Sequence, residues 1–238
     1  MHKRANLQDP TRTDMVKLAM KGLRQISITN NMRRPITINL LEIILLEISK
    51  SSELTFNKYL WSALFSTMYY ACLRVGEAAR STSSKHTLQF CQIATNQSNG
   101  TTSGYTIRFK SFKHNNASLS RVFIHSTNTN FCPVKCLTQY LLIRGNQAGD
   151  LFLLPDGHPL TRIMILRHLR RFLEAAGINS ALYNCHSFRI GRATDMLCQN
   201  YSAEVIKKVG RWNSDAYTRY LRPETITAPG RPGNTPAC

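Results

Sequence analysis

The spacing of apolar residues predicts a mainly helical chain. Apolar residues recur every three or four positions, the period of an amphipathic helix, in eight windows: 13–26, 36–49, 54–80, 133–144, 160–177, 187–199, 203–210 and 215–221. The window at 54–80 is almost wholly apolar, so it predicts one long buried helix. Pro35 and Pro133 stand where helices are expected to begin, and Gly177 closes the window before it.

Between two of these windows the pattern changes to alternation. The segments 88–94 (LQFCQIA), 104–112 (GYTIRFKSF) and 120–125 (SRVFIH) alternate and are rich in aromatic and β-branched residues, which is typical of strands. Polar stretches at 96–104 and 113–120 are expected to be their connecting turns. The predicted fold class is therefore α+β, mainly α, with a small three-stranded antiparallel sheet packed among helices.

The charge of the chain points to a polyanionic partner. Lys and Arg number 31 against 13 Asp and Glu, which gives a net charge of +18. No acidic residue lies between Glu77 and Asp150, although eight Lys and Arg residues do. Nucleic acid is the commonest partner of such a surface, because each neutralised phosphate releases a counterion. A surface that is simply basic is the plainer alternative.

Cysteine usage and hydropathy favour an intracellular protein with no membrane segment. The seven cysteines follow no regular disulfide framework, so we expect reduced thiols. Cys132 and Cys136 have the spacing of half a zinc site, but no second pair at ligand spacing accompanies them, so no metal site is predicted. The first ten residues lack the apolar run of a signal peptide, and no stretch approaches the ~20 apolar residues of a membrane span.

Two short segments hold candidate phosphate ligands. His186 and Arg189 are three residues apart, so on a helix they share one face, and the planar fork of an arginine matches a phosphate group. Arg74 ends an apolar helical pattern, where a charge is costly unless it is paired. Glu77 could pair with it and orient it, or the two could form an ordinary surface ion pair.

A lysine and a tyrosine could complete a reactive site. Lys113 lies in the predicted hairpin connection, where nearby cations could lower its pKa and allow it to give up a proton; Lys110 is a competitor. Positive charge around Tyr220 would stabilise its phenolate and activate it as a nucleophile, with Tyr217 as the alternative. Each residue taken alone has a structural explanation.

Taken in order, these residues resemble the signature of the tyrosine recombinases, also called the phage-integrase family. ACLRVGEA resembles the first-arginine box, HSFRIGRAT the His-x-x-Arg box, and VGRWNSDAYTRYLR the final box with the nucleophilic tyrosine. FCPVKCLTQYLLIRG is similar to the helix after the small sheet in eukaryotic mobile-element members. The wording of the final box is closest to Crypton and DIRS-type elements, and the resemblance covers residues 28–222.

The resemblance implies a DNA-breaking and rejoining enzyme. Arg74, His186 and Arg189 would hold the scissile phosphate, with Glu77 behind Arg74. Tyr220 would attack phosphorus to form a 3′-phosphotyrosyl bond, and Lys113 would protonate the 5′-hydroxyl. Further DNA contacts are expected from Arg108, Lys110, Arg192, Arg219 and Arg222. The resemblance implies no metal, no ATP and no other cofactor, with double-stranded DNA as partner, a homotetramer on that DNA, and a nuclear location if the source is eukaryotic.

The chain departs from the family pattern in two places. Arg211 stands where many relatives have His after Gly, and Trp212 follows it, so both are candidates for that position. Residues 1–27 are expected to be the last helix of an N-terminal clamping domain, 28–222 the catalytic domain and 223–238 a disordered Pro/Gly tail. These departures leave open an alternative, a catalytically inactive DNA-binding protein derived from a mobile-element recombinase.

Overall fold

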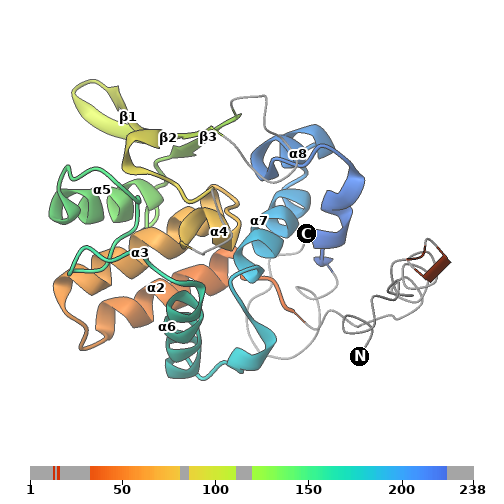
Figure 1. The fold of residues 1–238 in the computed structure, drawn as a ribbon, viewed down its shortest axis with the longest axis horizontal. Coiled ribbons are helices and arrows are strands. Elements are labelled where there is room, and N and C mark those ends of the chain that lie inside the picture. The colour runs from red at the N-terminus through yellow and green to blue at the C-terminus, as the bar shows by residue number, and fades with distance from the viewer. Residues whose placement is uncertain (1–12, 14, 17–32, 81–85, 111–119, 224–238) are drawn as a thin grey trace, which may run out of the picture. The chain divides into compact units, whose positions relative to one another are not determined.

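The computed structural model describes residues 13, 15–16, 33–80, 86–110 and 120–223. The chain divides into two units, residues 1–32 and 33–238, and all the elements named below belong to the second (Figure 1). Three predictions fall wholly or almost wholly outside the described residues: the helix at 13–26, the position of Lys113, and the tail at 223–238.

Helices form most of the second unit. They are α2 (Ile38–Lys50), α3 (Thr55–Tyr70), α4 (Val75–Ala78), α5 (Pro133–Arg144), α6 (Arg162–Ala175), α7 (Ser187–Cys198) and α8 (Ala203–Gly210), with 3-10 turns η3 (Phe90–Gln92), η4 (Ser180–Leu182) and η5 (Asp215–Tyr220). The apolar helix α3 lies at the centre and packs against α2, α5 and α7. Within the described residues, no helix is both long enough and apolar enough to cross a bilayer.

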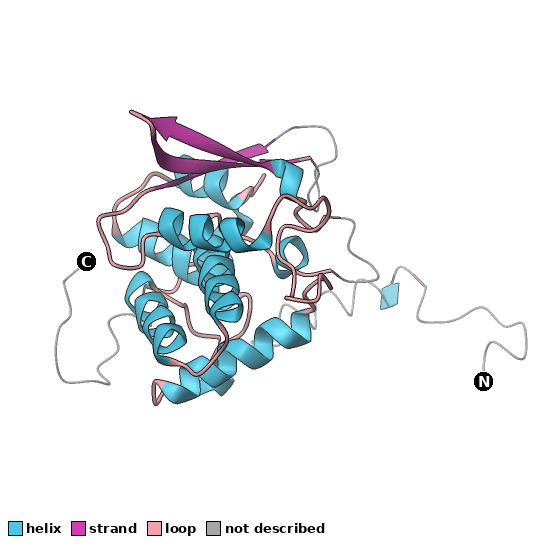
Figure 2. Ribbon diagram, turned by 90° about the vertical axis from the view of Figure 1, so that its left-hand side faces the viewer, coloured by secondary structure: helices cyan, strands magenta, loops and turns pink. Residues whose placement is uncertain are grey.

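The predicted sheet is present, with β1 (Ile93–Ser98), β2 (Thr101–Phe109) and β3 (Ser120–His125) antiparallel in the order β1-β2-β3. Tyr105, Ile107 and Phe109 alternate toward the core and are buried, because successive side chains of a strand point to opposite faces. Figure 2 shows the strands lying across one side of the helices. The α+β, mainly helical fold class is therefore confirmed.

The predicted loop at 96–104 is wrong, because both strands run through most of it. Only Asn99 and Gly100 turn the chain between β1 and β2, with φ angles of 49° and 74°. Positive φ at both central residues suits a two-residue hairpin, and Asn-Gly is the pair that adopts it most readily. The first strand also begins later than predicted, at Ile93, because residues 90–92 form a 3-10 turn.

The single long helix predicted over 54–80 is also wrong. Helix α3 ends at Tyr70, Cys72 adopts a positive φ of 49°, and α4 begins only at Val75. The break leaves the carbonyl groups of Ala71 and Cys72 free of helical hydrogen bonds, and arginines from distant segments bind both of them. Arg74 consequently lies at the N-cap of α4 and not within a helix.

Helix α7 is held tightly against the segment that precedes α2. The Ile36 N–H donates to the Ser187 carbonyl at 2.9 Å, and a Cβ added at Gly191 would lie 1.7 Å from the Ile36 carbonyl oxygen. Asp195 accepts from the Ile38 N–H at 2.7 Å and from the Tyr69 hydroxyl. These contacts fix α7, which carries Arg189 and begins directly after His186.

Candidate active site

Arg74 forms hydrogen bonds and an ion pair with Glu77, three residues further along the chain. Its N–H donates to Glu77 Oε2 at 2.8 Å, and its guanidinium lies 3.2 Å from Oε1. The Arg74 side chain is 23% exposed, whereas that of Glu77 is only 2% exposed. Burial and then the neighbouring Arg189 lower the pKa of Arg74, while Glu77 and the Tyr220 phenol act in the opposite direction. Arg74 is thus oriented by a buried carboxylate and still reaches solvent.

Arg189 lies fully buried in the first turn of α7 and joins three segments. Its Nη1 donates to the Cys72 carbonyl at 2.5 Å, and its Nη2 donates to the Gly210 carbonyl at the end of α8. Its guanidinium carbon lies 4.0 Å from the centre of the Trp212 ring. An arginine has five N–H donors, and Arg189 Nε is buried without a partner among the described residues. Donors therefore remain for an additional anion.

Arg211 points into the protein interior. It follows α8 in the left-handed conformation, with a φ of 57°, and its side chain is fully buried. Its Nη2 lies 2.7 Å from Glu77 Oε2, its Nη1 donates to the Ala71 carbonyl at 3.0 Å, and its guanidinium carbon lies 3.9 Å from the centre of the Phe109 ring. Burial lowers the pKa of Arg211, and Glu77 opposes that effect. Arg211 braces the break between α3 and α4.

Trp212, the next residue, packs against Tyr220. The centroids of these two rings are 4.9 Å apart, and the His186 ring centroid lies at the same distance from that of Tyr220. The guanidinium carbon of Arg189 lies 5.5 Å from the centre of the Tyr220 ring. Tyr217 packs against the other part of Trp212, at 6.4 Å. Of the two candidate tyrosines, the structure brings Tyr220 beside His186 and Arg189.

The Tyr220 main chain is anchored to α7 by Thr194, a residue that the sequence analysis did not select. Thr194 Oγ1 lies 3.3 Å from the Tyr220 carbonyl oxygen and accepts from the Arg222 N–H at 3.1 Å. The available signal was its place as the last residue of the HSFRIGRAT segment. Thr194 thereby fixes the end of η5 against the helix that carries Arg189.

His186 is kept neutral by its surroundings. Burial lowers the pKa of its imidazole to about 4, and the nearby Arg189, Arg33, Arg74 and Arg162 act in the same direction. The backbone N–H of His186 donates to Asn184 Oδ1 at 2.8 Å, and this hydrogen bond positions the start of α7. A neutral imidazole has one donor and one acceptor nitrogen. Near pH 7, His186 therefore stays neutral and can donate one hydrogen bond, such as to a phosphate oxygen, and accept another.

The predicted DNA-contacting residues occupy different environments. Arg108, Lys110 and Arg219 are exposed, and Arg222 is half-buried. Arg192 is also half-buried, with its guanidinium carbon 5.5 Å from the ring centres of both Tyr69 and Tyr70. Arg192 is thus committed to an aromatic and acidic cluster beside Asp195, unlike the exposed cations.

Cys132 belongs to the start of α5. Its sulfur lies 3.3 Å from both the Thr127 N–H and the Ser126 hydroxyl. Burial alone would raise its pKa, but hydrogen bonds from Ser126 and from backbone N–H groups lower the pKa to about 7. Burial raises the pKa of Cys136. Over the part of the chain that the structure describes, no group of three or more His, Cys, Asp or Glu residues could hold a metal ion.

Sequence comparison gives no relatives: no family model matches the chain, and neither does any curated protein. Solved structures do resemble it. The XerH site-specific recombinase bound to its difH substrate, in a pre-cleavage complex, matches 81% of this chain with a TM-score of 0.60 and 18% identity. The XerA recombinase matches 92% with a TM-score of 0.58 and 19% identity.

A lambda integrase dimer bound to a COC′ core site matches 81% of the chain, with a TM-score of 0.55 and 13% identity. The chain spans 52% of the XerH chain, 65% of the XerA chain and 49% of the lambda integrase chain. At these identities the likeness concerns architecture. The chain has the fold of a tyrosine-recombinase catalytic domain.

Proposed function

We propose that the chain is the catalytic part of a site-specific DNA recombinase or integrase that works through a covalent 3′-phosphotyrosine. The observation that carries the proposal is the packing of the Tyr220 phenol against His186 and Arg189. Tyr220 lies in a different segment of the chain from His186 and Arg189, and Arg74, from a third segment, is an electrostatic neighbour of the same phenol. A core needs no such gathering of cations around one tyrosine, whereas attack on a phosphodiester does.

In the proposed reaction, the Tyr220 oxygen attacks phosphorus and the bond from phosphorus to the 5′ oxygen breaks. The phenol proton passes to solvent as the new bond forms, and the neutral imidazole of His186 donates a hydrogen bond to a phosphate oxygen. Arg74 and Arg189 stabilise the negative charge that grows on the phosphate oxygens. The leaving 5′ oxygen takes a proton from Lys113, a role that the family resemblance suggests, with Lys110 as the alternative. The phosphotyrosyl bond conserves the energy of the broken bond, so religation needs neither ATP nor a metal.

The adjacent residues Arg211 and Trp212 are assigned different roles. Trp212 packs against the Tyr220 ring and the Arg189 guanidinium, so it helps to position the nucleophile beside that guanidinium. Arg211 contacts Glu77 and the α3–α4 break, so it acts on the phosphate only through Arg74. In this proposal Arg211 is a positioning residue, and Trp212 occupies the place beside the reacting phenol.

Double-stranded DNA is the proposed partner. The net charge of +18 and the exposed Arg108, Lys110 and Arg219 supply the cations, and the XerH and lambda integrase structures hold DNA sites. We further propose a homotetramer on DNA, a mobile-element origin of the Crypton or DIRS type, and a nuclear location if the source is eukaryotic. Residues 1–27 would be the last helix of a clamping domain, and 28–222 the catalytic domain.

Covalent capture tests the proposal. The full chain is incubated with a pool of nicked suicide duplexes of randomised sequence, with a chelator present, and the products are separated under denaturing conditions. A protein–DNA adduct is expected, and Tyr220→Phe should abolish it while Tyr217→Phe should retain it. An adduct formed by Tyr220→Phe would refute the assignment of the nucleophile. Salt-sensitive DNA binding with no adduct from the unmodified chain would favour the inactive DNA-binding protein.

A further inference from the structure

The outer face of the three-stranded sheet carries an unusual pair of like charges. Arg108 on β2 and Arg121 on β3 are directly opposite each other in the register, and both are exposed. Like charges at such positions destabilise a strand pair. No acidic residue occurs between Glu77 and Asp150, so the sheet has no carboxylate of its own to offset them. An anion between the two guanidinium groups would remove the repulsion.

A large aromatic side chain lies beside this pair. Phe123, the next outward residue of β3, is 53% exposed, although the inward residues Val122 and Ile124 are buried. The Phe123 and His125 rings are nearly parallel, at 22°, with centroids 6.2 Å apart. β3 is the last strand in the sheet order, so Phe123 and His125 lie on an edge strand of the sheet. An exposed aromatic on an edge strand invites aggregation unless something covers it.

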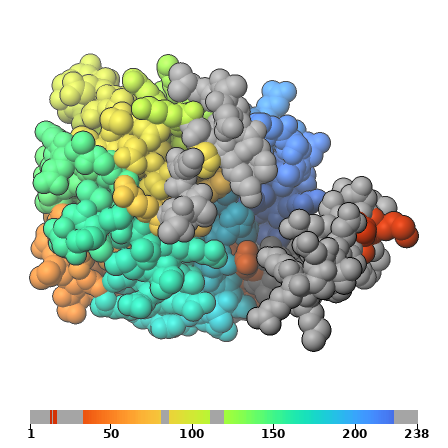
Figure 3. Space-filling view, in the orientation of Figure 1, coloured from red at the N-terminus to blue at the C-terminus, as the bar shows by residue number. Residues whose placement is uncertain are grey.

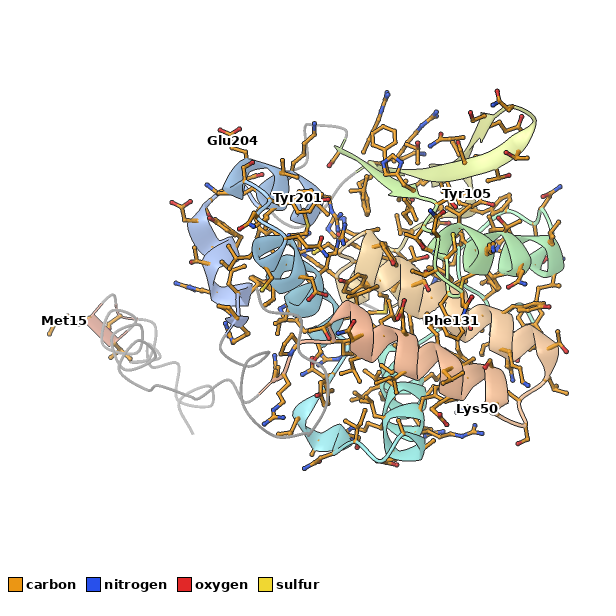
Figure 4. The ribbon with its side chains drawn as sticks, turned by 180° about the vertical axis from the view of Figure 1, so that it is seen from behind. Met15, Lys50, Tyr105, Phe131, Tyr201 and Glu204 are labelled. Atoms are coloured by element: carbon orange, nitrogen blue, oxygen red, sulfur yellow. The ribbon has the colours of Figure 1, made fainter. Side chains whose placement is uncertain are left out.

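The sheet is connected directly to the candidate active site. Phe109 follows Arg108 on β2 and points to the opposite, inner face, where its ring lies beneath the Arg211 guanidinium. On the same inner side, the Tyr105 hydroxyl lies 2.8 Å from Thr138 Oγ1 of α5, and Figure 4 shows Tyr105 where the sheet meets that helix. In the space-filling view the sheet, in yellow to yellow-green, lies at the upper left of the surface (Figure 3). A ligand on the outer face would therefore run close to the site without entering it.

We propose that this face, formed by Arg108, Arg121, Phe123 and His125, binds single-stranded DNA. A phosphate lies between the two arginines and a base stacks on the Phe123 ring. This pairing of cations with exposed aromatic rings is the usual chemistry of single-strand binding, because every unpaired base offers a π-face. In a duplex that π-face is covered by the neighbouring base pair, so an exposed ring gains little from it. The inference rests on the proposed function, since strand cleavage is what releases an unpaired strand beside this face.

Fluorescence anisotropy with labelled oligo(dT), and with the same strand annealed to oligo(dA), tests the inference. The full chain carries Tyr220→Phe throughout, so that no covalent product forms. Phe123→Ser should weaken oligo(dT) binding at least about fivefold, the lower range for loss of one stacked base, and change duplex binding less than about twofold. Arg121→Gln should weaken oligo(dT) binding and make it less sensitive to salt.

Leu142→Ser is the matched control, because Leu142 is an exposed apolar residue of α5, 76% accessible, outside the sheet. It should leave both affinities unchanged. The inference is overturned if Phe123→Ser binds oligo(dT) as tightly as its parent, or if it loses duplex binding equally. The adduct assay with a nicked duplex separates this result from the proposed function. Phe123→Ser with Tyr220 restored should still form the adduct. If the unmodified chain never forms an adduct, the proposed function is refuted, whereas the single-strand binding is judged by the anisotropy measurements.

Discussion

Removing one partner of the buried ion pair between Glu77 and Arg211 is expected to destabilise the protein severely. The Arg211 side chain is completely buried and that of Glu77 is 2% exposed, with 2.7 Å between Nη2 and Oε2. Breaking such a pair typically costs about 3–5 kcal/mol, because the remaining charge stays in the interior without compensation. Glu77→Gln removes the countercharge from Arg74 as well, so it should lie toward the upper end of that range.

The loss in free energy of unfolding of the double variant Glu77→Gln/Arg211→Met shows whether the two residues act as a pair or independently. Arg211→Met leaves Glu77 with only the partly exposed Arg74 as a counterion. It also removes the side-chain donor to the Ala71 carbonyl and leaves the Cys72 carbonyl with Arg189 as its donor. In the double variant neither unpaired charge remains. We therefore expect the combined cost to fall short of the sum by about 2 kcal/mol, within the range seen for residues in direct contact.

Urea unfolding followed by circular dichroism, with linear extrapolation to water, measures these changes in the free energy of unfolding. Glu47→Gln is the control, since Glu47 forms an exposed ion pair with Lys50 at 3.1 Å, three residues apart on α2. That pair should be worth no more than about 1 kcal/mol. If Glu77→Gln costs no more than Glu47→Gln, or if the two buried substitutions add without interaction, then the bracing role assigned to Arg211 is wrong.

Two further predictions concern the residues that surround Tyr220. The pKa of His186 falls from 6.5 to about 4 on folding, so between these pH values the unfolded chain binds a proton that the folded chain does not. The free energy of unfolding should therefore decrease by up to about 3 kcal/mol as the pH drops from 6.5 to about 4. His186→Asn should flatten the dependence of the urea midpoint on pH over the same range. An unchanged slope would contradict the burial of a neutral imidazole. Thr194→Val keeps the shape of the side chain but removes the hydroxyl that accepts from the Arg222 N–H and approaches the Tyr220 carbonyl. The rate of adduct formation should therefore fall about tenfold, as for a lost hydrogen bond worth about 1.4 kcal/mol. Thr194→Ser keeps the hydroxyl and should form the adduct at close to the parent rate, so equal rates for Val and Ser would remove the anchoring role.

Much of the fold could be predicted because its signals are local. The period of apolar residues places α5 and α6, and Pro133 and Gly177 mark a helix start and a helix end at positions that the structure confirms. The alternation in 120–125 predicts β3 to the residue. The hairpin between β1 and β2 was also locally encoded, in the Asn-Gly pair at 99–100, but the surrounding polar residues suggested a longer loop.

The break between α3 and α4 could not be predicted from local pattern. Residues 54–80 are apolar enough for one continuous helix, and nothing in that window supplies partners for the carbonyls that the break exposes. Those partners are Arg189 and Arg211, more than a hundred residues further along the chain. Tertiary hydrogen bonds from charged donors here replace intrahelical ones, and only the folded arrangement makes that exchange favourable.

The distinction between Arg211 and Trp212 has the same origin. Arg211 stands where many members of the family have His and Trp212 directly follows it, and no sequence rule decides between these neighbours. The left-handed conformation of Arg211 ends α8 and sends the two side chains to different environments, one onto Glu77 and the other onto Tyr220. Because Glu77 also holds Arg74, the arginine of the last motif supports the arginine of the first. Substituting Arg211 should consequently impair the α3–α4 segment before it affects the phenol, whereas substituting Trp212 should act on the phenol directly.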